Sequence, residues 1–348
     1  METALDYHPK ILVDTSGLSR EEWLAYRRKG IGGSDTGSIL GISPFKTARD
    51  LYFEKLEIVS VEDDEENWIA KEVGQRLEEL VAKIFTKMTG LKAFRRPYMY
   101  QHPLYPWMLA DLDYLVEMPD GTLAILECKT TSASGNWWYD GREIVPVYYE
   151  TQGRHYMAVM NLNKVFFCCY VLGSGDEAII RSIDRDMDYE LELIALEHDF
   201  WHDNVLAKNP PPYTESGDLI MESLKRTLGP ADENAPPVVL TVAQSSLGAR
   251  FLEVKQRKKE LDDELNVVKA QMEKLKAHIV SLMGTSCKAI YEDADGGYAV
   301  TFNPSRRPIV TTENIERMKA VHPDMYAEYV TMSESRRFNA KRVTAKAA

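Results

Sequence analysis

Charged side chains occupy a stretch of this sequence that otherwise has the composition of buried β-strands. Residues 108–130 read MLADLDYLVEMPDGTLAILECKT, in which Asp111, Asp113, Glu127 and Lys129 stand among Leu, Ile, Val and Ala. Burying a charged group is costly unless the group is paired or binds a metal. A fold that accepts this segment must therefore provide partners for these four side chains.

The same stretch has the pattern of a β-hairpin, with strands over 107–117 and 122–130 joined by the turn sequence MPDG. Since side chains alternate along a strand, we expect Asp111 and Asp113 on one face, and Glu127 and Lys129 together on one face of the second strand. The hairpin would bring Asp113 and Glu127 together, where two carboxylates repel unless a divalent cation such as Mg²⁺ lies between them. Lys129 could then orient an attacking water or stabilise the charge of a phosphoryl transition state. A surface ion pair between Glu127 and Lys129 is the alternative that this pair alone leaves open.

The remainder of the first 208 residues alternates between helical and strand patterns. Helices are predicted over 67–89, 147–161 and 187–207, and strands around 93–101 and 164–173. This order predicts a mixed α/β (α+β) core, with a mixed central sheet flanked by helices. No apolar run is long enough for a transmembrane helix, and the four cysteines have neither metal-finger nor disulfide-framework spacing, so a cytoplasmic protein with no membrane contact is expected. The net charge of −12 argues against a chain that coats nucleic acid with its whole surface.

Two proline-rich breaks, KNPPPYTESGD and GPADENAPP, divide the chain. They predict a domain over 1–208, a linker with one short helix over 209–240, and a C-terminal part over 241–348. Within the last part, apolar residues recur in alternating steps of four and three and are interrupted by Lys258, as in a coiled-coil seam that ends at Gly284. Its partner could be the chain itself, a sister subunit or another protein. Two short strands, a helix near 312–330 and the basic sequences SRRP and SRRFNAKR complete a small α+β segment that could contact DNA phosphates. The seam consists of Leu247, Phe251, Val254, Leu261, Leu265, Val268, Met272, Leu275, Ile279 and Leu282.

The segment WLAYRRKGIGGSDTGSILGISPFKT closely resembles the N-terminal motif of the YqaJ-like viral recombinase family. These proteins are relatives of the lambda-type exonuclease within the PD-(D/E)xK nuclease superfamily. The resemblance implies that Arg27 and Ser34 contact a DNA phosphate near the cut or at the 5′ end. Elementary chemistry agrees, because arginine grips phosphate with two hydrogen bonds and a glycine turn opening a helix offers backbone N–H groups to an anion. A plain capped helix start is the alternative.

Further matches to the family follow in the expected order through about residues 19–205. GQRLEEL points to Glu78 rather than Glu79 near the metal, and Tyr114 in ADLDY replaces a glycine that is frequent in relatives. His155 is expected to be a packed or supporting residue. The resemblance implies a site in which the metal ligands are Asp113, Glu127, the backbone carbonyl of Cys128 and Glu78, the catalytic lysine is Lys129, and the site is completed by Gln152 and Tyr149.

These observations together predict a Mg²⁺-dependent deoxyribonuclease of phage recombination, with Mn²⁺ as a substitute metal. It would degrade one strand of double-stranded DNA from its ends, in the 5′-to-3′ direction, to leave single strand for annealing. No iron–sulfur cluster is expected, because the early cysteine and late cysteine triplet of cluster-bearing relatives are absent. By resemblance, the partners are a single-strand annealing protein and further copies of the chain, in a ring such as a trimer. An endonuclease with the same site and a DNA-end-binding scaffold without activity are the alternatives. Trp137 or Trp138 could stack on an unpaired base.

Overall fold

The computed structural model describes residues 7–58, 68–173, 178–228, 234–293, 296–304 and 311–330. The chain divides into two compact units, Met1–Glu233 and Asn234–Ala348. The acidic sequence EDDEEN and the basic sequences SRRP and SRRFNAKR lie outside the described residues. In the part of the chain that is described, no helix combines the length and the apolar character needed to cross a membrane.

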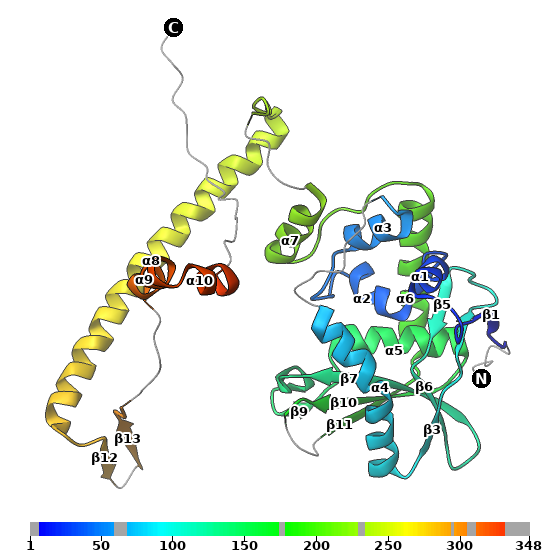
Figure 1. The fold of residues 1–348 in the computed structure, drawn as a ribbon, viewed down its shortest axis with the longest axis horizontal. Coiled ribbons are helices and arrows are strands. Elements are labelled where there is room, and N and C mark those ends of the chain that lie inside the picture. Colours follow the sequence, from blue (N-terminus) through cyan, green and yellow to red (C-terminus); the bar gives the residue numbers. More distant parts are fainter. Residues whose placement is uncertain are drawn as a thin grey trace. The chain divides into compact units, whose positions relative to one another are not determined.

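A five-stranded mixed sheet forms the centre of the first unit (Figure 1). Its strand order is β11 (Ala178–Asp184), β10 (Lys164–Val171), β7 (Leu123–Thr131), β6 (Tyr114–Glu117) and β3 (Lys92–Phe94). Only the β7–β10 pair is parallel, and the chain crosses between these two strands through helix α5 (Val147–Met160). The α+β core with a mixed central sheet flanked by helices is confirmed.

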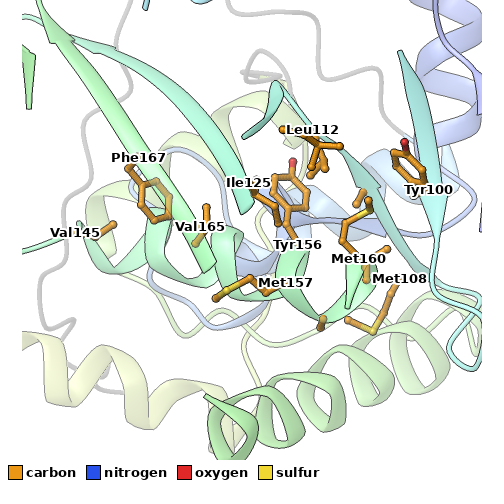
Figure 2. Packing of buried hydrophobic residues seen from close by; sticks show 14 of the residues in the cluster. Tyr100, Met108, Leu112, Ile125, Val145, Tyr156, Met157, Met160, Val165 and Phe167 are labelled. Atoms are coloured by element: carbon orange, nitrogen blue, oxygen red, sulfur yellow. The ribbon is translucent and has the colours of Figure 1, made fainter. Parts of the chain in front are cut away.

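Alternation along β7 divides its side chains between the two faces of the sheet. Ile125 packs with α5 residues such as Met157, together with Val165 and Phe167 of β10 (Figure 2). On the opposite face, Leu126 and its neighbours pack against helix α4 (Trp68–Thr89). Glu127 and Lys129 lie two and four residues after Ile125 and therefore on the same face of the sheet, toward α5. This agrees with the predicted alternation.

Helix α5 approaches β10 closely because residue 153 is a glycine. A Cβ atom at Gly153 would lie 2.6 Å from Phe167 Cζ and 2.8 Å from Val165 Cγ1. These distances are shorter than normal contacts between packed side chains. Gly153 therefore determines how near α5 comes to the strands that carry Glu127 and Lys129.

A second sheet of four strands shows that one of the sequence predictions was wrong. Its order is β1 (Lys10–Asp14), β4 (Tyr98–Gln101), β5 (Met108–Asp111) and β2 (Ile31–Gly32). The predicted single strand over 107–117 is divided between this sheet, as β5, and the central sheet, as β6. The predicted strand over 93–101 is divided in the same way into β3 and β4, with Pro97 in the break. Asp113 thus lies in a crossover between two sheets rather than within a strand.

The first unit begins with several short helical segments. Ser19 and Glu22 form a capping box at the start of α1 (Arg20–Arg27), as a Ser-x-x-Glu sequence favours. A short 3₁₀ turn (Gly33–Asp35), α2 (Thr36–Ile39) and α3 (Ala48–Leu56) follow. The helical segment predicted over 187–207 is α6 (Met187–Asp199), continued by a π-helical turn over Phe200–Leu206. The connection from β7 to α5 contains a 3₁₀ turn (Gly135–Trp137), β8 (Trp138–Tyr139) and β9 (Arg142–Glu143).

Part of the segment predicted as a linker belongs to the first unit. Helix α7 (Gly217–Leu228) lies against α3, where Ser223 Oγ donates to Asp50 Oδ1 at 2.7 Å and Arg226 Nη2 lies 3.0 Å from Asp50 Oδ2. Asp50 is buried, so these bonds satisfy a charge that would otherwise be costly. The first compact unit accordingly continues to Glu233 instead of ending at residue 208.

The second unit contains the long predicted helix. α8 (Val242–Met283) begins at a capping box formed by Thr241 and Gln244 and ends at Gly284, which has a φ of 59°. It is followed by the antiparallel pair β12 (Lys288–Asp293) and β13 (Gly296–Thr301), and by α9 (Thr312–Val321) and α10 (Pro323–Tyr329). The predicted long helix, its end at Gly284 and the small α+β segment are therefore present, whereas the pairing of the seam stays a prediction.

A buried histidine connects three elements of the first unit. His155 Nδ1 in α5 lies 2.7 Å from Glu197 Oε1 in α6, and its Nε2 lies 2.8 Å from the carbonyl oxygen of Leu109 in β5. Since a carboxylate and a carbonyl both accept hydrogen bonds, each ring nitrogen must donate and the imidazole is a cation. Burial opposes this charge, but Glu197 outweighs burial and the pKa of His155 is raised. The expectation that His155 is a packed residue agrees with this position.

We expect the substitution His155→Gln to destabilise the protein by about 3 kcal/mol, because it leaves Glu197 as an unpaired buried charge. Since the pKa of His155 is raised in the folded state, its stabilising contribution is fully present below about pH 6.5, the usual value for histidine, and is lost as pH rises through the folded value. The measurement is the free energy of unfolding in urea from pH 6 to 9. The cost of His155→Gln should shrink as pH increases.

His102 provides the matched control. Its Nδ1 accepts hydrogen bonds from the backbone of Leu104 and Tyr105, and burial lowers the pKa of His102 to about 4. Its imidazole is thus neutral in the folded protein, and that of the unfolded chain is neutral above about pH 7.5, so the cost of His102→Gln should not change between pH 7.5 and 9. A cost of His155→Gln that is equally constant would show that His155 is neutral.

Candidate active site

Glu127 and Lys129 are joined to α5 through Gln152. Lys129 Nζ lies 2.8 Å from Glu127 Oε1 and donates to Gln152 Oε1 at 3.1 Å, while Gln152 Nε2 donates to the same Glu127 oxygen at 2.6 Å. All three side chains are largely buried, so the pair is not a surface ion pair. The second oxygen, Glu127 Oε2, is also buried and has no hydrogen-bond partner among the described residues. Oε1 of Glu127 is therefore fixed by two hydrogen bonds, and Oε2 is available to a further ligand.

Asp113 meets this group from the crossover between the two sheets. Its Oδ2 accepts a hydrogen bond from the backbone N–H of Cys128 at 2.8 Å. Tyr114 pairs with Leu126 at the end of the β6–β7 ladder, so the next pair outward is Asp113 and Glu127. The structure thus brings Asp113, Glu127 and the Cys128 peptide together.

Asp111 does not share a strand face with Asp113, which corrects the expectation from alternation. Asp111 ends β5, and its Oδ2 accepts a hydrogen bond from Trp23 Nε1 of α1 at 2.6 Å. The chain changes sheets at Leu112 and Asp113, so the two acids have different partners. Asp111 therefore connects the central hairpin region to α1.

The acids of this group repel one another. Burial and then the charge of Glu127 raise the pKa of Asp113 to about 7. Burial also raises the pKa of Glu127, against the opposing effect of Lys129. Burial and the charge of Asp113 raise the pKa of Glu78 to about 7. Lys129 and Arg95 therefore leave one of the three carboxyl groups without a compensating charge, and a bound cation would relieve this excess.

Glu78 is paired with an arginine that the sequence did not suggest. Arg95 Nη2 lies 2.9 Å from Glu78 Oε2, across the gap between α4 and the loop that follows β3. In contrast, Glu79 is mostly exposed and pairs with Lys83 of its own helix. The preference for Glu78 over Glu79 agrees with this orientation. As the described side chains stand, no three acidic, histidine or cysteine groups converge closely enough to hold a metal ion.

Lys129 remains positively charged in this environment. Burial works against its charge, but the carboxylates of Glu127 and Asp113 outweigh burial and raise the pKa of Lys129 above its usual value. Its Nζ also lies 4.6 Å from the centre of the Tyr149 ring, a further contact that favours a cation. Lys129 can therefore donate hydrogen bonds and stabilise negative charge, but it cannot act as a base near neutral pH.

A second buried carboxylate, Asp35, organises the glycine-containing motif near the N-terminus. Its Oδ1 lies 2.9 Å from Arg27 Nη2 and 3.3 Å from Lys46 Nζ, and its Oδ2 lies 2.7 Å from Lys55 Nζ. Although burial acts in the opposite direction, Arg27 with Lys55 and Lys46 lowers the pKa of Asp35 well below its usual value. Although Asp35 stands at the N-cap of α2, its side chain does not cap that helix and is turned toward these cations.

The Asp35 cluster leaves positive charge available near Ser34. Even with Glu54, which lies 2.8 Å from Lys46 Nζ, three cations face two carboxylates. Arg27 Nη2 also donates to Ser34 Oγ at 2.9 Å, and the guanidinium is partly exposed. The Ser34 hydroxyl, which accepts from Arg27, still has its own proton to donate. Arg27 and Ser34 therefore have the charge and the donors that an anionic ligand needs.

Tyr156 lies between the two groups. Gln152 Nε2 is 3.4 Å from Tyr156 Oη, and a Cβ atom at Gly33 would lie 2.6 Å from the Tyr156 ring. A second contact joins the same elements, since Thr36 Oγ1 lies 3.1 Å from Thr151 Oγ1. The helix α5 thus carries residues that touch both the acidic group and the loop of Arg27 and Ser34.

The two tryptophans after β7 differ in exposure. Trp137 is buried and its ring centre lies 5.9 Å from that of Tyr149. It is therefore a core residue and cannot stack on an unpaired base. Trp138 is about half exposed, and the Arg181 guanidinium lies 5.1 Å from its ring centre.

Comparison with known proteins identifies relatives of this chain. The family model for the YqaJ-like viral recombinase domain matches residues 22–163. Uncharacterized protein YqaJ of Bacillus subtilis (strain 168) is 31% identical over 339 residues, which are 96% of this chain and 98% of that protein.

Two solved structures are more distantly similar. An alkaline exonuclease (LHK-Exo) from Laribacter hongkongensis is 18% identical with a TM-score of 0.43, over 59% of this chain and 98% of that one. A phage-related exonuclease from Haemophilus somnus 129PT is 13% identical with a TM-score of 0.39, over 51% of this chain and 96% of that one. The family match and the similarity to YqaJ along nearly the whole chain agree with the predicted resemblance. This chain belongs to the YqaJ-like viral recombinase family.

Proposed function

We propose that this protein is a Mg²⁺-dependent deoxyribonuclease that degrades one strand of double-stranded DNA from its 5′ end. The observation that carries the proposal is the buried pair Glu127 and Lys129 beside Asp113, with one Glu127 oxygen lacking any partner among the described residues. Membership of a viral recombinase family supports a phage-type exonuclease acting on DNA. A cytoplasmic setting, a single-strand annealing protein as partner and a ring such as a trimer belong to the same proposal.

The donor set fits a hard divalent cation. Carboxylate and backbone carbonyl oxygens are its preferred ligands. Here burial and the neighbouring carboxylates raise the pKa values of Asp113 and Glu78, although Lys129 and Arg95 oppose this effect. Asp113, Glu127 and the Cys128 carbonyl would hold the ion, with Glu78 supporting it after exchanging its bond to Arg95. When bound, the cation would supply Lewis-acid activation of the phosphate and of water. Mn²⁺ would serve as a substitute.

The protein's own residues supply positioning and charge. Lys129, fixed by Glu127 and Gln152, would donate to the attacking water or to a phosphate oxygen and stabilise the negative charge that develops there. Its raised pKa means that it keeps its proton during this step. Tyr149, under the lysine, would help to hold its direction. Arg27 and Ser34 would bind a phosphate of the substrate strand.

The proposal assigns different roles to the two parts of the chain. All residues of the proposed site lie before residue 160, within the predicted nuclease domain 1–208 and within the first compact unit. The cleavage chemistry is therefore assigned to this unit, and the C-terminal part over 241–348 is assigned to assembly or partner binding. Helix α7 would stay with the nuclease unit because it satisfies Asp50.

Removal of a proposed metal ligand tests the chemistry. We expect Asp113→Asn and Glu127→Gln to reduce Mg²⁺-dependent cleavage of linear duplex DNA more than tenfold, a barrier change above about 1.4 kcal/mol. Asp113→Asn also relieves carboxylate repulsion in the free protein, so its melting temperature should stay constant or rise. Glu127→Gln instead leaves the buried Lys129 without its carboxylate partner, so its melting temperature should fall. Cleavage rates are measured with end-labelled duplex, and melting is measured on the same samples.

The matched control uses two neighbouring glutamates on α4. Glu78→Gln should lower the rate, whereas Glu79→Gln, on the exposed side, should not. Covalently closed circular duplex serves as a second substrate, since only an endonuclease cuts it. Protein that binds DNA ends with Mg²⁺ present but never shortens them would favour the scaffold alternative and refute the proposal.

Arg27 is expected to distinguish a 5′-phosphate from a 5′-hydroxyl. If the phosphate bound near Ser34 is the terminal one, wild-type protein should degrade the phosphorylated end faster. Arg27→Gln should lower that rate about ten- to hundredfold, the equivalent of about 1.5–3 kcal/mol for a lost charged hydrogen bond, and should reduce the difference between the two ends. The measurement is the rate on two duplexes that differ only at the 5′ terminus.

Arg28 is the control for this experiment because it is adjacent, basic and paired with Glu57 instead of Asp35. Arg28→Gln should retain the preference for the 5′-phosphate. Equal slowing of both ends by Arg27→Gln, with the preference unchanged, would mean that Arg27 binds the duplex in general and does not recognise its end.

A further inference from the structure

Helix α8 carries an apolar stripe whose side chains are largely exposed in the part of the chain that the structure describes. The seam residues defined above, from Leu247 to Leu282, are each between 37% and 88% exposed. They repeat with the heptad spacing of a coiled coil over almost the entire helix, which is 42 residues long. A contiguous apolar surface of this kind is typical of an interface rather than of a solvent-facing helix.

The heptad positions follow from the spacing. Phe251, Lys258, Leu265, Met272 and Ile279 occupy the a positions, and the remaining seam residues occupy the d positions. The flanking e and g positions then contain both acidic and basic residues. In coiled coils these flanking charges set partner choice and orientation, so they distinguish parallel from antiparallel pairing of α8 with itself.

Parallel pairing of two α8 helices places attractive charges across the seam. In this orientation a g residue faces the e residue five positions later on the other helix. Arg257 then meets Asp262 of the second copy, and Glu264 meets Lys269 of the second copy, each twice by symmetry. Two kinds of repulsive contact remain, Arg250 with Lys255 near the N-terminal end and Lys258 with Lys258 of the second copy at a core position.

Antiparallel pairing along the whole seam gives the opposite result. There g faces g and e faces e, so that Glu264 meets Glu264 and Asp262 meets Asp262 at the centre, and Lys255 meets Lys269. No attractive pair is formed. Sliding the antiparallel helices by one heptad in one direction restores attraction but leaves Leu275, Ile279 and Leu282 without apolar partners. Sliding them in the other direction leaves only Leu247 unpaired, but each attraction of Asp262 to Lys269 is then balanced by a repulsion of Lys255 from Lys276.

We propose that α8 is a self-association element, which pairs in parallel and in register with α8 of a second copy of this chain. Lys258, the single charged residue at a core position, fits this role because a lone polar a residue fixes register at some cost in stability. The inference does not depend on the proposed nuclease activity. It assigns the C-terminal part a defined partner, another copy of itself with the same N-to-C direction.

Cross-linking of the full-length chain tests the orientation. Cys287 is exposed and is first replaced by serine, while the other three cysteines are buried. Leu247→Cys in this background should be joined to a second copy by a short bifunctional maleimide, because identical positions meet in a parallel pair. In an antiparallel pair the two residues 247 would be roughly 35–50 Å apart at 1.5 Å per residue.

An equal mixture of Leu247→Cys and Ile279→Cys chains reports the antiparallel alternative. Cross-links between Leu247→Cys chains support the proposal. Cross-links only in the mixture would overturn the parallel orientation, and the absence of cross-links in both samples would overturn self-association through α8 and favour a different protein as partner. The Asp263→Cys chain, on the outer face of the helix, sets the background yield.

Charge reversal provides a second readout. Lys269→Glu turns the attraction to Glu264 into repulsion and should weaken self-association on the order of five- to tenfold, seen as a lower cross-linking yield of Leu247→Cys at matched concentration. The double change Glu264→Lys with Lys269→Glu should restore the yield. Lys274→Glu, a reversal away from the seam, should leave it unchanged. An unaltered or higher yield with Lys269→Glu would contradict the parallel register.

Discussion

The two oxygens of the Glu127 carboxylate differ in their surroundings, and the rest of the site depends on this difference. Its Oε1 accepts from Lys129 and from Gln152, so that β7 and α5 are joined by a triangle of short hydrogen bonds. Its Oε2 is buried without a partner among the described residues. Such an oxygen is costly unless another ligand satisfies it. The close approach of α5 to β10 at Gly153 and the hydrogen bond from the Cys128 N–H to Asp113 fix the elements that surround this carboxylate.

Two buried acidic groups in the first unit differ in how their charge is balanced. Asp35 is surrounded by Arg27, Lys46 and Lys55, and its pKa is strongly lowered. Asp113, by contrast, has the charge of Glu127 nearby and a raised pKa. The first group therefore has positive charge to offer to an anion, and the second has negative charge to offer to a cation. Phosphate binding beside a divalent metal requires this combination, and Tyr156 on α5 lies between the two groups.

Much of this arrangement could be predicted from local sequence patterns. The capping box at Ser19, the heptad helix ending at Gly284 and the shared face of Glu127 and Lys129 follow from rules that act within a few residues. The division of 107–117 between two sheets could not be predicted, because alternation assumes a continuous strand and no glycine or proline marks the step at Leu112. The cations around Asp35 come from three separate segments, and the Arg95–Glu78 pair joins residues 17 apart, so only the folded chain reveals them.

Binding of a divalent cation to the free protein tests the central claim most directly. The proposed ion lies between Asp113 and Glu127. Titration calorimetry with Mn²⁺ should therefore show one binding site in the full chain. Asp113→Asn and Glu127→Gln should each weaken the affinity at least tenfold, about 1.4 kcal/mol, while Glu79→Gln should bind as the wild type does. Equal Mn²⁺ affinity in all of these proteins would contradict the account, because the cation would then lie elsewhere.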